Sequence, residues 1–170
     1  MSAETNIQAN VFEEVVIGTQ TWMAQNYDFG GTWPANNIDN ITEYGKTYTW
    51  AEAVAIADGT VGWHLPTHDE LYALQQYVAD PTPIYTGGGH LKKVGTTHWL
   101  APNTGADNST GFGAVGSIGG LLGYDCYIWG EENSEDTDEA FILTLAHDND
   151  YCGLSVYAKT GQCAVRLIKD

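Results

Sequence analysis

The sequence has little positive charge. Its 170 residues contain 22 acidic residues but only six basic ones, so the formal net charge is −16. The basic residues are scattered along the chain, at Lys46, Lys92, Lys93, Lys159, Arg166 and Lys169. A chain with this charge is repelled by nucleic acid and by anionic membranes. We therefore expect no nucleic-acid partner.

Long apolar runs are also missing. No stretch approaches the roughly 18 apolar residues of a membrane-spanning helix, so we expect no insertion into a membrane. The N-terminus lacks a basic region followed by an apolar one, and the sequence therefore predicts no secretion signal. This length suits one hydrophobic core. We expect residues 1–14 to form a leader and residues 15–170 to form a single domain.

Cysteine is scarce, and the common catalytic and metal-binding motifs are absent. Zinc-type spacing is missing from the three cysteines, Cys126, Cys152 and Cys163. One disulfide with a spare thiol and three reduced cysteines on strands both remain open. His64 and His68 lie four residues apart, but Pro66 breaks any helix between them. There is no nucleophile elbow, phosphate loop or dinucleotide fingerprint. We predict no catalytic residue, no metal site and no cofactor.

Two helix-start signals are present. Residues 49–52 and 67–70 both read Thr-x-x-Glu. In this capping box the Thr hydroxyl accepts a backbone N–H, and the Glu carboxylate accepts the N–H of the Thr. The sequence therefore predicts short helices that begin near residues 50 and 68.

The remaining pattern is typical of short strands. Residues 15–22 alternate around Gly18-Thr19 and predict a tight hairpin. The last third predicts a meander of four strands, at 124–129, 141–145, 154–157 and 163–168. Two helices beside such strands indicate an α+β domain. Long connections rich in Gly, Thr and Asn lie between residues 84 and 123, and such connections often carry binding functions.

The motifs "IGTQTWMAQNYD", "YGKTYTWAEAVA", "GWHLPTHDEL", "LKKVGTTHW", "GFGAVGSIGG", "YIWGEEN" and "AVRLIKD" occur in an order that resembles one known family. This is the Fibrobacter succinogenes major paralogous domain family, and the resemblance runs from about Val15 to the end. It implies the C-type-lectin-like fold in the variety shared with formylglycine-generating enzymes. That fold has two short helices, a small twisted antiparallel sheet and long loops, and its N- and C-terminal strands meet.

Two related activities remain alternatives. Formylglycine-generating enzymes are oxidases that use active-site cysteines, but the three cysteines here do not align with that pattern. Calcium-dependent lectins hold calcium through loop carboxylates, and "EENSEDTDEA" at 131–140 is rich in them. The spacing is not that of an EF-hand, and the lectin tripeptides Glu-Pro-Asn and Trp-Asn-Asp are absent. A solvated acidic loop is the favoured interpretation.

In "YIWGEEN", Gly130-Glu131 stands where the family commonly has Ser-Ser or Ser-Thr. This departure puts any hydroxyl role in doubt.

The chain also resembles the variable proteins of diversity-generating retroelements, which use the same fold and diversify exposed C-terminal positions by mutation at adenines. Such proteins are displayed on virions or cell surfaces. Asn codons mutated at adenine can become Asp or Tyr codons, among others, and Tyr, Asn and Asp side chains are also typical of a paratope. We therefore predict a non-catalytic module that binds a protein or a glycan. The predicted binding residues are Asp125, Tyr127, Trp129, Glu131, Asn133, Asp148, Asn149, Asp150, Tyr151 and Tyr157.

Simpler roles compete at several of these positions. In 124–129, Tyr124, Cys126 and Ile128 are expected to face the core, and the alternate residues to face outward. Burial in the core is the favoured role for Trp129. The 147–151 segment also reads as a plain turn. Arg166, the only arginine, is expected to form an ion pair with an acidic side chain such as Glu132.

Overall fold

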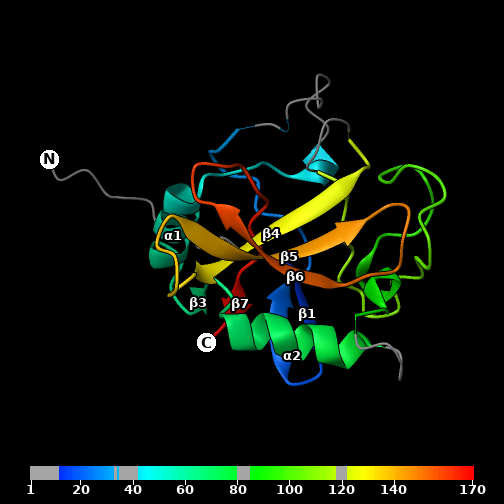
Figure 1. Cartoon of the computed structure of the whole chain (residues 1–170), viewed down its shortest axis with the longest axis horizontal. Helices are drawn as coiled ribbons and strands as arrows, with labels where there is room; N and C mark the ends of the chain where they lie inside the picture. Colours follow the sequence, from blue (N-terminus) through cyan, green and yellow to red (C-terminus); the bar gives the residue numbers. More distant parts are fainter. Residues whose placement is uncertain (1–11, 33, 35–41, 80–84, 118–121) are drawn as a thin grey trace, which may run out of the picture.

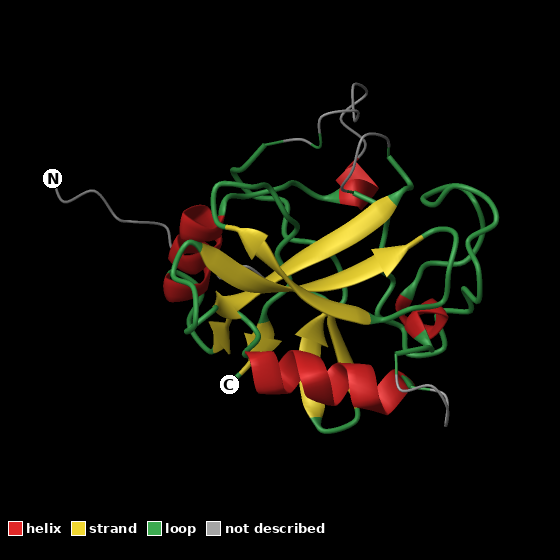
Figure 2. Ribbon diagram, in the orientation of Figure 1, coloured by secondary structure: helices red, strands yellow, loops and turns green. Residues whose placement is uncertain are grey.

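The structure is a computed structural model that describes residues 12–32, 34, 42–79, 85–117 and 122–170. These residues form an α+β domain with two α-helices, two short 3-10 helices and two antiparallel sheets (Figures 1 and 2). The helices are η1 (Thr42–Tyr44), α1 (Trp50–Asp58), α2 (His68–Val78) and η2 (Gly88–Leu91). The strands are β1 (Glu14–Ile17), β2 (Gln20–Met23), β3 (Trp63–His64), β4 (Asp125–Glu132), β5 (Glu139–Ala146), β6 (Gly153–Ala158) and β7 (Ile168–Lys169).

The predicted N-terminal hairpin is confirmed as β1 and β2. It belongs to a sheet with the order β1-β2-β7-β3, so the N- and C-terminal strands meet, as expected. The predicted boundary between leader and domain falls inside β1. Phe12 already packs on Tyr27 and Trp63, with ring centroids 5.9 Å away in both cases. The rest of the predicted leader, residues 1–11, lies outside the described residues.

Both predicted capping boxes are present. Thr49 caps α1 and Thr67 caps α2, each with its hydroxyl bonded to the third helical N–H and with the Glu carboxylate bonded back to its own N–H. Leu71, Leu74 and Val78 bury one face of α2 in the core. No helix of the described residues is both long enough and apolar enough to cross a membrane.

The corner between the two helices is fastened to β4. The Glu131 N–H donates to the Pro66 carbonyl (2.9 Å), and the His68 N–H donates to the Glu131 carboxylate (2.7 Å). Space here is tight, because a Cβ on Gly130 would lie 3.0 Å from the Pro66 oxygen and 2.8 Å from a Leu71 methyl. A serine at position 130 would not fit without a shift of the Leu71 side chain and of the Pro66 carbonyl.

His64 joins three parts of the chain at this corner. Its Nδ1 lies 2.7 Å from Asp170 Oδ1, and its Nε2 lies 3.0 Å from both Glu70 carboxylate oxygens. Partial burial lowers the pKa of His64, but its hydrogen bonds to Asp170 and Glu70 outweigh that effect, so the pKa is raised. The protonated imidazole therefore links β3, the start of α2 and the residue after β7.

We expect His64 to make stability depend on pH. Because its pKa is raised in the folded state, its contribution is complete below the unfolded value of about 6.5 and is lost as pH rises through the folded pKa. The three side chains are partly exposed, so the contribution is under about 1 kcal/mol. The melting temperature of the parent should fall between about pH 6 and 8, relative to that of His64→Gln. Parallel melting curves for the two proteins would contradict this role.

The second sheet has the order β4-β5-β6 and crosses the middle of the molecule (Figure 1). Side chains alternate between its faces. Cys126 and Ile128 are fully buried in the core, as predicted, whereas Asp125 and Tyr127 on the opposite face are partly open to solvent. Tyr124, which was expected in the core, is 41% exposed because it lies before β4 begins.

The predicted strand at 163–168 is mostly a buried connecting segment. Only its end belongs to a ladder, as β7. The Cys163 N–H donates to the Tyr48 carbonyl (3.0 Å), and the Ala164 N–H donates to the Tyr127 carbonyl (2.9 Å). Successive residues of this segment thus form hydrogen bonds with different parts of the chain. This change of partners explains why no continuous strand forms there.

The expected ion pair between Arg166 and Glu132 is wrong. Arg166 is 1% exposed, and its Nε donates to Asn26 Oδ1 (2.7 Å). Its Nη groups donate to the carbonyls of Phe112 and Gly113. Glu132 instead pairs with Lys159. The guanidinium is held by neutral oxygens, and burial lowers its pKa to about 10.

Candidate functional site

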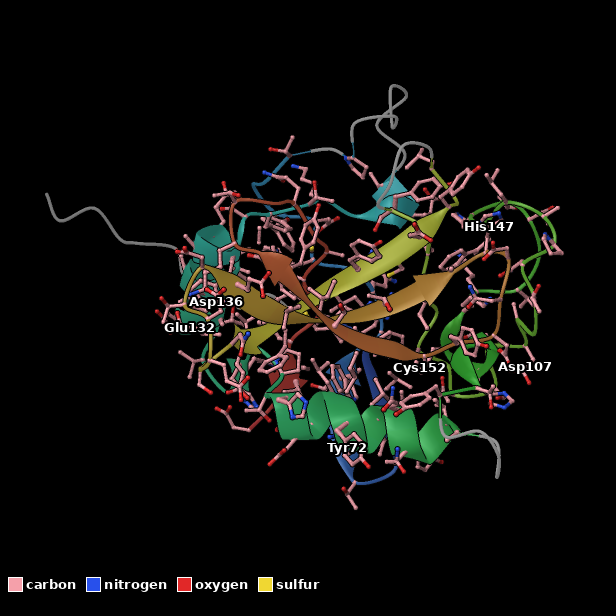
Figure 3. All side chains as sticks on the ribbon, viewed as in Figure 1. Tyr72, Asp107, Glu132, Asp136, His147 and Cys152 are labelled. Carbon is pink, nitrogen blue, oxygen red and sulfur yellow. The ribbon has the colours of Figure 1, made fainter. Side chains whose placement is uncertain are left out.

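A wide groove of about 920 Å³ lies between the β4-β5-β6 sheet and α2. One wall comes from strand residues such as Tyr127, Thr144 and Ser155, and the other comes from His68 and Tyr72 of α2. Figure 3 shows Tyr72 on the side of α2 that faces the viewer, below the sheet. The two walls come from parts of the chain far apart in sequence, so the folded domain is needed to form the groove.

Four of the predicted binding residues line this groove. Asp125 and Tyr127 come from β4, and Asn149 and Tyr151 come from the connection between β5 and β6. Tyr151 is 56% exposed. Burial raises the pKa of Asp125; the nearby His147 opposes this shift and Asp148 adds to it, so this carboxyl group gains from a cationic or hydrogen-bonding partner. The structure therefore brings these predicted side chains together on one side of the molecule.

Trp129 lies in the core and does not line the groove, as the favoured interpretation expected. It is 0% exposed, and its Nε1–H donates to the Tyr48 carbonyl (2.7 Å). Tyr157 covers it with ring centroids 5.9 Å apart, and Tyr157 also lies 5.8 Å from the ring of Tyr127. Tyr157 is 37% exposed and extends the aromatic surface beyond the groove.

Asp150 points into the protein rather than toward a ligand. Its carboxylate accepts the N–H groups of Gly89 (2.6 Å) and Gly87 (3.2 Å). A Cβ on Gly105 would lie 2.4 Å from the same carboxylate, so the backbone closes around it. Asp148 is exposed and accepts a hydrogen bond from the Asn149 amide (3.0 Å). Asp150 therefore holds the loop that presents its neighbours.

Glu131 and Asn133 lie away from the groove. The Glu131 carboxylate binds the first N–H of α2, and the Asn133 side chain accepts the Glu135 N–H (3.1 Å). Figure 3 shows the acidic loop, labelled at Glu132 and Asp136, at the opposite end of the sheet from His147. The ten predicted residues therefore do not form one surface.

Sequence reasoning missed the helical wall of the groove. His68 and Tyr72 lie one turn apart on α2, and Tyr72 is 45% exposed. Tyr85, also lining the groove, is 54% exposed. The available signal was the pair of aromatic side chains on the polar face of a helix, opposite its apolar residues.

The buried Lys92 holds the rim of the groove. It is 0% exposed, and its Nζ donates to the carbonyls of Thr104 (2.7 Å), Ala146 (2.9 Å) and Asn149 (2.9 Å). Burial lowers the pKa of Lys92, although Asp150 and Asp148 oppose this shift. The ammonium group thus ties the turn that carries Asn149 to the end of β5 and to Thr104.

The described cysteines are poorly suited to oxidative chemistry. Cys126, Cys152 and Cys163 are free and buried, so no disulfide links them. Burial raises the pKa of Cys126 and Cys152 to about 12 and that of Cys163 as well. A thiol that stays protonated is a weak nucleophile and a weak metal ligand.

Ser109, His90 and Asp107 lie together on the surface. The Ser109 hydroxyl lies 2.9 Å from His90 Nδ1, and the nearer Asp107 oxygen lies 2.9 Å from the same nitrogen. A catalytic triad needs the serine and the carboxylate on opposite ring nitrogens. Asp107 also accepts the Ser109 N–H (2.8 Å), which is a turn interaction. This cluster therefore stabilises a loop.

Across the described part of the chain, no group of three or more His, Cys, Asp or Glu side chains is placed to hold a metal ion. In the acidic loop, Asp136 accepts the Asp138 N–H (3.0 Å). Lys159 binds both Glu132 and the Thr137 carbonyl, and it lies 4.1 Å from the centroid of the Trp50 ring. The loop is held by a cation from the protein itself.

Comparison with known proteins identifies the family. Residues 15–169 match the model of the family described as the Fibrobacter succinogenes major domain. The match covers most of the 170 residues, so the chain belongs to this family. No curated protein and no solved structure matches.

Proposed function

We propose that this member of the Fibrobacter succinogenes major domain family is a non-catalytic binding module whose groove recognises a protein or glycan ligand. The observation that carries the proposal is the gathering of Asp125, Tyr127, Asn149 and Tyr151 around one open groove. Two of them lie on a strand and two lie on a loop, and all four are polar or aromatic. They are the side chains with which adaptable binding surfaces are made.

The division of roles supports the proposal. Lys92 and Asp150 fix the backbone of the loop from inside, while Asn149 and Tyr151 remain at its surface. A loop held in this way can change its surface residues without losing its path. Tyrosine gives a large contact area for little loss of side-chain entropy, and Asn adds adjustable hydrogen bonds.

We further propose that the domain has the C-type-lectin-like fold and is a variable protein of a diversity-generating retroelement. Two capped helices, meeting terminal strands and long connections support the fold. Tyr127, Asn149 and Tyr151 support diversification, because Asn codons mutated at adenine can become Tyr codons and all three residues line the groove. A reverse-transcriptase gene beside a near-identical repeat in the flanking DNA distinguishes a diversified surface from a fixed one.

Replacing both Tyr127 and Tyr151 by serine is expected to weaken ligand binding at least about tenfold, because two aromatic rings that would contact the ligand are lost. Ligands are first selected with the parent domain from a library of displayed proteins and from a glycan array. Affinity is then measured by calorimetry for the parent and for the double variant. Tyr77→Ser is the matched control, because Tyr77 is 59% exposed on α2 and does not line the groove.

Equal affinity in the parent and in the double variant would place the ligand elsewhere and defeat the proposal. Selection of glycans alone, with affinity that requires added calcium, would favour a lectin. Melting curves of the variants show whether the fold is kept. Loss of the exposed Tyr151 should change stability little, whereas Tyr127 packs against the core and Tyr157, so its loss should cost some stability.

A further inference from the structure

The outer edge of β6 has unpaired backbone groups. In β5, Glu139 O accepts the Asn133 N–H, so the odd-numbered residues of β5 bond toward β4 and the even-numbered ones toward β6. The register pairs Thr144 with Gly153 and Ile142 with Ser155, so these β6 residues bond inward. The N–H and C=O groups of the alternate residues of β6, Leu154 and Val156, therefore point away from the sheet.

The opposite edge of the sheet, at β4, and the chain just before β6 are both covered. On β4, the Trp129 N–H donates to the Ala164 carbonyl (3.0 Å). Just before β6, the Cys152 N–H donates to the Tyr85 carbonyl (2.8 Å), and the Cys152 carbonyl accepts the Gln75 amide (2.6 Å). Beyond Cys152 this cover stops. No hydrogen bond from another described residue reaches the outward groups of Leu154 or Val156.

Open space lies beside this edge. Leu154 and Ser155 line the groove described above, together with His68 and Tyr72 of α2. Figure 2 shows β6 diverging from α2 toward its C-terminal end. A strand laid along β6 would have one set of side chains over α2 and the other set near Tyr157. Side chains on both sides of such a strand therefore have surfaces to contact.

The charge around the groove selects the partner. Asp125 lies in the groove, and the exposed Asp69 lines a smaller hollow that shares His68 with it. Two further carboxylates of that hollow have partners within the protein, because Glu131 accepts the His68 N–H and Glu132 pairs with Lys159. No lysine or arginine is among the described residues that line either space. A second copy of this chain would bring another net charge of −16 to the same edge. A segment of positive charge fits better.

We infer that the edge of β6 binds an extended, cationic peptide segment of a partner protein as an added strand. The peptide backbone pairs with Leu154 and Val156, and the basic side chains of the peptide lie near Asp125 and Asp69. This inference rests on the proposed binding function and names the ligand class of that groove. Backbone pairing provides affinity with little demand on sequence, while the groove residues choose among peptides.

The test uses a fluorescent peptide of about eight residues in which lysine and valine alternate, measured by anisotropy with the full chain. A second peptide has the same sequence but carries N-methyl groups on backbone nitrogens along both sides of the extended chain. The methyl groups remove the backbone N–H donors and leave the charge unchanged. We expect at least about tenfold weaker binding of the second peptide. An alternating glutamate and valine peptide should not bind. Equal binding of the methylated peptide would show simple charge attraction and overturn the inference.

A variant isolates the edge of the protein. Val156→Pro removes an outward N–H that the sheet does not use, so it should weaken binding of the lysine peptide at least about tenfold. Val156→Thr keeps the N–H and the branched shape, and it should bind like the parent. Undiminished binding by a folded Val156→Pro protein would overturn the inference.

Amide exchange keeps the test decisive if Val156→Pro does not fold. In the parent, exchange at Leu154 and Val156 should be fast and should slow when the lysine peptide is added, while Leu143 inside the sheet stays unchanged. Unchanged exchange at the edge would overturn the inference. If selected ligands require Tyr127 and Tyr151 but ignore Val156→Pro, the groove still binds ligands and only the strand pairing fails. Pairing of two copies of the chain through their β6 edges, in place of peptide binding, would also overturn the inference.

Discussion

Arg166→Met is expected to lower the free energy of unfolding by about 3 kcal/mol or more. The change removes the donors for Asn26 Oδ1 and for the carbonyls of Phe112 and Gly113, of which the first two bonds are buried and the third is partly buried. Each buried acceptor left without a donor costs about 1–3 kcal/mol. This is a large part of a typical domain stability of about 5–15 kcal/mol. The melting temperature should fall by about 6–12 °C or more in calorimetry.

Two further variants separate the network from the charge. Lys169→Met removes an equal charge from an exposed pair with Glu14 and should cost less than about 1 kcal/mol. Arg166→Lys keeps a buried charge, but a lysine ammonium group lacks the planar guanidinium fork that reaches acceptors in three directions. We therefore expect it to lose most of the stability that Arg166→Met loses. An Arg166→Met protein that melts like the Lys169→Met protein would contradict this account.

Lys92→Met is expected to lower stability by about 3 kcal/mol and to loosen the rim of the groove. It leaves the carbonyls of Thr104, Ala146 and Asn149 without their ammonium donor. The Ala146 carbonyl ends β5, and the Asn149 carbonyl lies within the turn between β5 and β6. Amide exchange at residues 147–151 should therefore quicken more than exchange in β4, and ligand affinity should fall even where the domain remains folded.

The adjacent residue supplies the control. Lys93→Met removes the same charge, but the only hydrogen bond described for Lys93 as a donor comes from its backbone, to the Ala114 carbonyl. Its stability and its loop exchange should stay close to those of the parent. Equal loss of stability in both variants would mean that net charge, rather than the three carbonyl bonds of Lys92, holds the turn.

Features set by neighbours in sequence were predictable. The capping boxes at Thr49 and Thr67 involve residues three apart, and the hairpin of β1 and β2 depends on its own turn. The alternation that separates Asp125 and Tyr127 from Cys126 is a property of any strand. Each of these predictions is confirmed because the physical cause lies within a few residues.

Features set by distant contacts were not predictable. Asp150 turns inward because the N–H groups of Gly87 and Gly89 need an acceptor, and nothing near it in sequence shows this. Burial of Trp129 was favoured from the sequence, but its strand position alternates with outward residues, so the sequence did not show that Tyr157 and the Tyr48 carbonyl cover it. The residue type of Arg166 likewise did not indicate its partners. An arginine commonly pairs with a carboxylate, but the guanidinium of Arg166 donates to backbone carbonyls.

The position of residues 163–168 has a consequence for how the domain folds. This segment closes contacts across nearly the whole chain, as in the bonds of Arg166 to Met23 and Asn26, 143 and 140 positions away. Neither the hairpin nor the central sheet can complete its hydrogen bonding before the last residues are available. Folding of the domain is therefore expected to be slow and to finish only once residues 163–168 have been synthesised, with shorter nascent chains left dependent on protection from aggregation.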